Sequence, residues 1–225
     1  MSITLSQLNT DEVLRYMGTP PERADAGLRA VVERCSARML EAIRPRWAWK
    51  LYPLSFSPEG VQLEGGPALP GQSLSEHLTG CDRAVVFCAT LGARADTLIR
   101  QGQCADVLQA LALDCCASAA VEQVCDRIEE ELYGQFPGCY FPYRFSPGYG
   151  DLPLSVQADL LDALDAHRRV GLCATGSHIL TPRKSVTAIL GVADHPIEQH
   201  KRSCVGCPAR HGCQYRKSGG HCGIL

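Results

Sequence analysis

A long helical pattern occupies residues 106–132, near the middle of the 225-residue chain. Its apolar side chains recur at the spacing of one broad helix face, and an acidic run at residues 129–131 closes the pattern. The apolar positions are Val107, Leu108, Leu111, Cys115, Ala119, Val124 and Ile128. This spacing predicts a long helix with one apolar face. A continuous apolar run at residues 84–88 predicts a buried strand before it.

The other expected elements are helices at residues 11–17, 28–43 and 155–167, and strands at 47–56, 170–175 and 185–192. Helices and strands do not alternate strictly along the chain. This order favours an α+β fold over a doubly wound sheet. We expect a single domain over residues 1–194, with a central, mainly antiparallel, twisted sheet flanked by helices.

The composition excludes several classes of protein. Hydrophobic residues make up 45% and charged residues 20% of the chain, which is typical of a globular protein rather than a disordered one. The net charge of −2 provides no polybasic field for nucleic acid or an anionic membrane. No uncharged apolar run approaches the roughly 20 residues of a membrane span, and residues 1–10 lack the pattern of a signal peptide. We therefore expect a cytoplasmic protein with no nucleic-acid or membrane partner.

The chain contains 13 cysteines. An odd number without an export signal favours thiols in a reducing compartment over a disulfide scaffold. Cysteine packs as a small hydrophobe when it lies among aliphatic residues. Core positions are therefore predicted for Cys88, Cys115, Cys116, Cys125 and Cys173.

The last segment, residues 195–225, is predicted to be a small basic appendage rich in cysteine. It carries five lysines and arginines, and it has no acidic residue after position 198. Four closely spaced thiolates can wrap one cation, which would be either zinc or an iron–sulfur cluster. These candidate ligands are Cys204, Cys207, Cys213 and Cys222. His211 or His221 can replace one of them, and a flexible tail with free thiols is the alternative.

The segment at residues 140–151 contains too many prolines and glycines for a helix or a strand. It lacks the full glycine pattern of a dinucleotide or P-loop site. We expect an extended loop that presents Arg144 and Tyr149, because proline stiffens the backbone and glycine permits close approach of a ligand. A purely structural turn is the alternative.

Two further polar positions are candidates for binding. Glu122 follows a stretch of small residues at 117–120, which leaves room either for a ligand or for close helix packing. Thr175 and Ser177 follow an expected strand, where their hydroxyl groups can face a ligand or close a turn.

In order along the chain, Arg144-x-x-Pro147-Gly148-Tyr149 is followed by a helix and by Thr175-x-Ser177. Pro182 and the run at residues 185–188, Ser-Val-Thr-Ala, come next. Together these motifs resemble the activation (reactivation) domain of cobalamin-dependent methionine synthase in its free-standing form. The resemblance covers about residues 8–192.

This resemblance implies a reactivation subunit that binds S-adenosylmethionine (AdoMet). Its methyl group is offered to cobalamin held by a partner, the cobalamin-binding methionine synthase subunit. A flavodoxin- or ferredoxin-type donor supplies one electron to cob(II)alamin. The chain would thus belong to a methyltransferase system of methionine biosynthesis without making methionine alone. The alternative is a metal- or Fe–S-containing redox or docking protein for another corrinoid methyltransferase.

The resemblance also assigns roles to individual residues. Arg144 is expected to contact the AdoMet carboxylate, and Tyr149 is expected near the methyl group as the catalytic residue. Ser146 occupies a position where the family uses backbone contacts, and Glu122 is expected to balance the positive charge of the ligand. The expected binding site also includes Gly148, Thr175 and Ser177.

Overall fold

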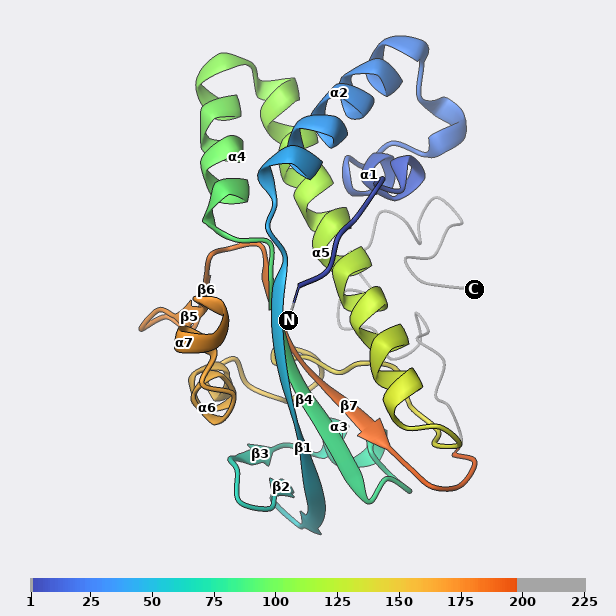
Figure 1. Ribbon diagram of the computed structural model, residues 1–225, viewed down its shortest axis with the longest axis vertical. Helices are drawn as coiled ribbons and strands as arrows, with labels where there is room; N and C mark the ends of the chain where they lie inside the picture. The colour runs from blue at the N-terminus through green and yellow to red at the C-terminus, as the bar shows by residue number, and fades with distance from the viewer. Residues whose placement is uncertain (1, 198–225) are drawn as a thin grey trace. The chain divides into compact units, whose positions relative to one another are not determined.

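The computed structural model describes residues 2–197 of the chain (Figure 1). Within this part the chain forms two compact units that are interleaved along the sequence. Unit 1 contains residues 2–49, 87–137 and 157–187, and unit 2 contains residues 50–86, 138–156 and 188–197. The expected boundary between a domain at 1–194 and a tail at 195–225 stays a prediction.

Unit 1 is built mainly from helices. They are α1 (Thr10–Tyr16), η1 (Pro21–Arg23), α2 (Ala26–Ala42), α4 (Ala93–Ala105), α5 (Val107–Gln135), α6 (Val156–Ala163) and α7 (Ala166–Val170). Figure 1 shows α2 and α4 beside the long α5, and α1, α2 and α4 all pack against it. Helices α1, α2 and α5 each begin with a side-chain cap. In each, a side-chain oxygen accepts a hydrogen bond from a backbone N–H of the first turn, and the capping residues are Asn9, Asp25 and Asp106.

Helix α5 confirms the predicted long helix, with one shift of its apolar face. Val107, Leu108 and Leu111 are exposed, and the buried apolar face begins at Ala112. By length and composition alone α5 could cross a membrane, but half of its most apolar window is buried within the protein. Packing against the three neighbouring helices accounts for that apolar face.

The main sheet has five strands in the order β3-β2-β1-β4-β7. They are β1 (Arg46–Ser57), β2 (Gly60–Leu63), β3 (Ala68–Pro70), β4 (Arg83–Thr90) and β7 (Ser185–Val192), with the short helix α3 (Gln72–His77) after β3. Antiparallel ladders join β1 to β2 and β2 to β3. Strands β1, β4 and β7 each continue from one unit into the other.

Hydrogen bonds at the strand ends give the direction of the central strands. Leu54 N donates to Asp82 O over 2.9 Å, so the end of β1 lies beside the start of β4. Leu91 N donates to Lys184 O over 3.0 Å, so the end of β4 lies beside the start of β7. Both pairs are therefore antiparallel, and the predicted α+β fold with a mainly antiparallel sheet is confirmed.

Several element predictions need correction. The single helix expected at residues 155–167 is two helices, because Asp165 adopts a left-handed conformation (φ 49°) between α6 and α7. The strand expected at 170–175 is reduced to β5 (Cys173–Ala174), which pairs with β6 (Leu180–Thr181) outside the main sheet. Helices α3 and α4 and strands β2 and β3 were not predicted.

Every cysteine that the structure describes is a free thiol. Cys88, Cys115, Cys116 and Cys125 are buried as expected, whereas the prediction for Cys173 is wrong because the short hairpin strand β5 leaves it exposed. Burial raises the pKa of Cys88 and Cys115 to about 11 and that of Cys116 to about 12. Cys88, Cys115 and Cys116 are therefore neutral thiols at physiological pH and pack as small apolar side chains.

Candidate functional site

The proline- and glycine-rich segment of unit 2 is attached to β7 by two antiparallel bridges. Tyr140 and Ala193 exchange backbone hydrogen bonds of 2.8 and 3.0 Å. Phe145 and Ile189 do the same over 2.9 and 2.8 Å. These backbone hydrogen bonds to a buried strand at the edge of the sheet thus hold the irregular segment in place. The absence of a helix or strand predicted at residues 140–151 is confirmed, and the loop is anchored rather than free. The prediction that it presents Arg144 is wrong, because the Arg144 side chain is buried.

Beyond Phe145 the loop closes into two tight turns. Tyr149 N donates to Ser146 O over 3.0 Å, and Gly148 N donates to Leu152 O over 2.8 Å. Gly148 has a φ of 91°, a backbone conformation that residues with a side chain rarely adopt. The turns leave Tyr149 46% exposed, with its ring edge-on to Phe145 at 5.8 Å. The loop therefore presents an aromatic hydroxyl on a fixed backbone.

Arg144 is buried, at 8% exposure, in the middle of this loop. The flanking backbone is held by His77 of α3, whose Nε2 donates to Tyr143 O over 2.6 Å. The His77 ring also packs against Tyr143 and Phe145, with centroids 4.2 and 5.2 Å away. A guanidinium remains charged in such surroundings. The same loop thus carries a buried cation and an exposed tyrosine.

Asp151 ties the end of the loop to the start of α3. Its carboxylate accepts bonds from Gln72 N at 2.8 Å and Ser73 N at 3.0 Å. Gly71 precedes this helix and offers no capping side chain, so Asp151 caps α3 from a distant part of the sequence. The Gln72 and Ser73 amides lower the pKa of Asp151 from its ordinary value of 3.8. Sequence analysis did not identify this role.

We expect Asp151→Asn to lower the melting temperature by about 2–4 °C at pH 7, because asparagine offers one uncharged acceptor oxygen where the carboxylate binds two amides. Because folding lowers the pKa of Asp151, the carboxylate stabilises the protein above about pH 4. This stabilisation is lost as the pH falls through the pKa of the folded state. In thermal melts at pH 7, 4 and 3, the melting temperatures of the wild type and Asp151→Asn should become more similar as the pH falls. Asp162→Asn, at an exposed position on α6, is the control, and a pH-independent difference would contradict the capping role.

Arg144, Ser146, Gly148 and Tyr149 all lie in this one loop of unit 2, whereas Glu122, Thr175 and Ser177 belong to unit 1. Glu122 is half-buried on α5. The Thr175 and Ser177 hydroxyls lie 3.0 Å apart, and Thr175 Oγ1 accepts a bond from Ile179 N over 3.1 Å. These hydroxyls thus close the turn between β5 and β6. A binding role for the three residues stays a prediction.

Lys184 forms a polar cluster with α5 that sequence analysis missed. Its ammonium group bonds to Asp114 Oδ1 at 3.0 Å and Ser118 Oγ at 2.9 Å. The lysine side chain is only 14% exposed. Because it lies 70 residues from Asp114, no local pattern could reveal the pairing.

The four candidate metal ligands, Cys204, Cys207, Cys213 and Cys222, lie outside the described residues. Within residues 2–197, no group of three or more His, Cys, Asp or Glu side chains could hold a metal ion. A metal site in the tail remains a prediction.

No family model and no curated protein sequence matches this chain. Thirteen chains of solved structures do match it. One is a MetH reactivation domain bound to AdoHcy, with a TM-score of 0.64 and 13% sequence identity. The match covers 98% of this chain and 85% of that one. This chain therefore has a fold similar to that of the reactivation domain.

Proposed function

We propose that the chain is a reactivation subunit that binds AdoMet and presents its methyl group to a cobalamin held by a methionine synthase subunit. The observation that carries this proposal is the fold similarity over 98% of the chain to a reactivation domain bound to AdoHcy. The Arg144-x-x-Pro147-Gly148-Tyr149 sequence adds independent support, since it lies on an anchored loop.

Arg144 is the proposed partner of the AdoMet carboxylate. Its side chain is buried, and hydrogen bonds between opposite charges are stronger when water is largely excluded. The planar fork of a guanidinium also matches the two oxygens of a carboxylate. A buried arginine in a rigid loop therefore suits the recognition of an amino-acid carboxylate.

Tyr149 is the proposed catalytic residue beside the methyl group. Its ring is half-exposed and packs against Phe145, so its position is fixed while it remains accessible to a second protein. Ser146 and Gly148 would contribute backbone contacts to AdoMet.

The proposed reaction transfers a methyl group. The partner's cobalamin would accept the methyl group after one-electron reduction by a flavodoxin- or ferredoxin-type donor, and AdoHcy would remain on this chain. The contribution of this chain is to bind AdoMet and hold the methyl group in line with the cobalt.

An anaerobic calorimetric titration with AdoMet tests the proposal. We expect the wild-type protein to bind, and Arg144→Ala to bind about tenfold to hundredfold more weakly, because a charge-assisted contact is lost. Tyr149→Ala changes an exposed side chain and should also weaken binding without unfolding the protein. Arg168→Ala, at a position on α7 whose side chain is 83% exposed, is the control.

Circular dichroism should show that the Arg144→Ala variant is folded. Arg144→Lys keeps the charge but loses the planar pair of N–H donors. Its affinity for AdoMet should therefore fall between those of the wild type and the alanine variant. Wild-type protein that does not bind AdoMet would contradict the proposed function. Equal binding by the wild type and by folded Arg144→Ala would contradict the proposed site.

A further inference from the structure

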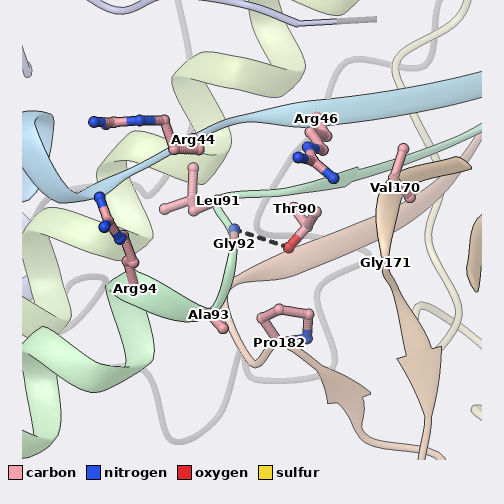
Figure 2. A pocket seen from close by; sticks show the side chains of 10 residues that line it. All are labelled: Arg44, Arg46, Thr90, Leu91, Gly92, Ala93, Arg94, Val170, Gly171 and Pro182. Carbon is pink, nitrogen blue, oxygen red and sulfur yellow. Dashed lines mark hydrogen bonds between the residues drawn. The ribbon is translucent and has the colours of Figure 1, made fainter.

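Unit 1 contains a pocket of about 300 Å³ where β4 passes into α4. Three arginines line it, namely Arg44, Arg46 and Arg94. Figure 2 shows their side chains around the turn at Leu91 and Gly92. None of the described residues that line the pocket is acidic. The pocket therefore combines three positive charges with no neutralising side chain in its wall.

Hydrogen bonds to backbone carbonyl groups hold Arg44 in place, and no such bond to a described residue holds the side chains of Arg46 and Arg94. Arg44 N donates to Leu91 O over 2.9 Å, and Arg44 Nη1 donates to Glu41 O and Ile43 O over 2.8 and 2.6 Å. These bonds hold one side of its guanidinium at the end of α2. Arg46 and Arg94 form no ion pair or side-chain hydrogen bond with any residue in the range 2–197. Like charges repel each other, so an anion bound in this pocket would reduce that repulsion.

The start of α4 adds a second source of positive potential. Its N-cap is Gly92 (φ 86°), and no side chain caps the helix among the described residues. Gly92 N donates to Thr90 Oγ1 over 3.1 Å, while the following residues, Ala93 and Arg94, both line the pocket. The first amides of a helix attract anions. The start of α4 and the three arginines therefore both favour an anionic ligand.

We propose that this pocket binds the phosphoryl group of a small molecule, as a phosphate ester or a diphosphate. Three guanidinium groups and a helix start offer more donors than one carboxylate accepts, whereas a phosphoryl group presents several charged oxygens. The volume leaves room for the rest of a small ligand. The pocket shares no residue with the Arg144–Tyr149 loop, so the inference is independent of AdoMet binding.

Calorimetric titration of the full chain with inorganic pyrophosphate at low salt tests this inference. We expect saturable binding by the wild type and about tenfold to hundredfold weaker binding by Arg94→Ala and by Arg46→Ala. Both side chains are exposed, so these changes should leave the fold intact. Arg100→Ala is the matched control on the same helix, because Arg100 lies outside the pocket and bonds to Thr97 Oγ1.

Titrations with ribose 5-phosphate and malonate identify the ligand chemistry. Tighter binding of pyrophosphate favours a diphosphate ligand, tighter binding of ribose 5-phosphate favours a phosphate ester, and either result supports the inference. Binding of malonate as tight as that of both phosphoryl probes would overturn it. Equal weakening by Arg100→Ala, or no saturable binding of either phosphoryl probe, would also overturn it.

Discussion

Gly150→Ala is expected to destabilise the protein by about 2–5 kcal/mol, the sum of a left-handed backbone cost and an overpacking cost. Gly150 has φ 52°, which carries the first cost. A Cβ at this position would lie 2.4 Å from Ser73 Cβ and Oγ. The Ser73 Cβ cannot rotate away, so the backbone of the loop or of α3 must move. Urea denaturation of both proteins measures the difference.

Gly65→Ala is the matched control for the backbone cost. Gly65 has φ 71°, and no atom of the described residues lies within 4 Å of the place that an added Cβ would take. Gly65→Ala should therefore lower the free energy of unfolding only by the conformational cost of about 1–2 kcal/mol. Equal destabilisation by the two substitutions would contradict a steric contact between Gly150 and Ser73.

Removing the Ser73 side chain should rescue the Gly150 variant. In a Ser73→Gly background, Gly150→Ala is expected to cost only about as much as Gly65→Ala, and the double-mutant cycle isolates the contact. If the loop binds AdoMet, Gly150→Ala should also weaken that binding, and the rescue should restore it. These measurements separate the packing of the loop from its proposed function.

The sequence predicted the elements whose signal is local. Helix α5 has a repeating apolar face, and β4 has a continuous apolar run, so their own residues reveal them. Strands β2 and β3 are short, at Gly60–Leu63 and Ala68–Pro70, and lie within a segment rich in glycine and proline. They become strands through pairing with β1 and with each other. A short local pattern could not predict them.

In the candidate site, too, the local features could be predicted and the long-range contacts could not. The loop around Arg144 was predicted because its prolines and glycines exclude regular structure. The contacts that anchor it could not be predicted, since His77 bonds to a carbonyl 66 residues away and Ser73 to a carboxylate 78 residues away. The arginine pocket likewise joins residues from separate parts of the chain, Arg44 and Arg46 with Arg94. Such sites depend on tertiary structure.

Phe87 lies in the predicted apolar run, and it is fully buried in β4, at 0% exposure. We expect Phe87→Ala to destabilise the protein by about 3–5 kcal/mol, because apolar burial is lost and a cavity remains. A loss of this size lowers the melting temperature by roughly 6–20 °C for a chain of this length. Phe87→Leu fills more of the space and should cost less.

Phe56→Ala on β1 is the control for Phe87→Ala, because its ring is 48% exposed and makes a smaller contribution to the core. Thermal melts and urea unfolding of the three variants and the wild type measure the differences. The expected order of destabilisation is Phe87→Ala, then Phe87→Leu, with Phe56→Ala close to the wild type. Equal effects of the two alanine substitutions would contradict a core position for Phe87, since burial would then not determine the cost.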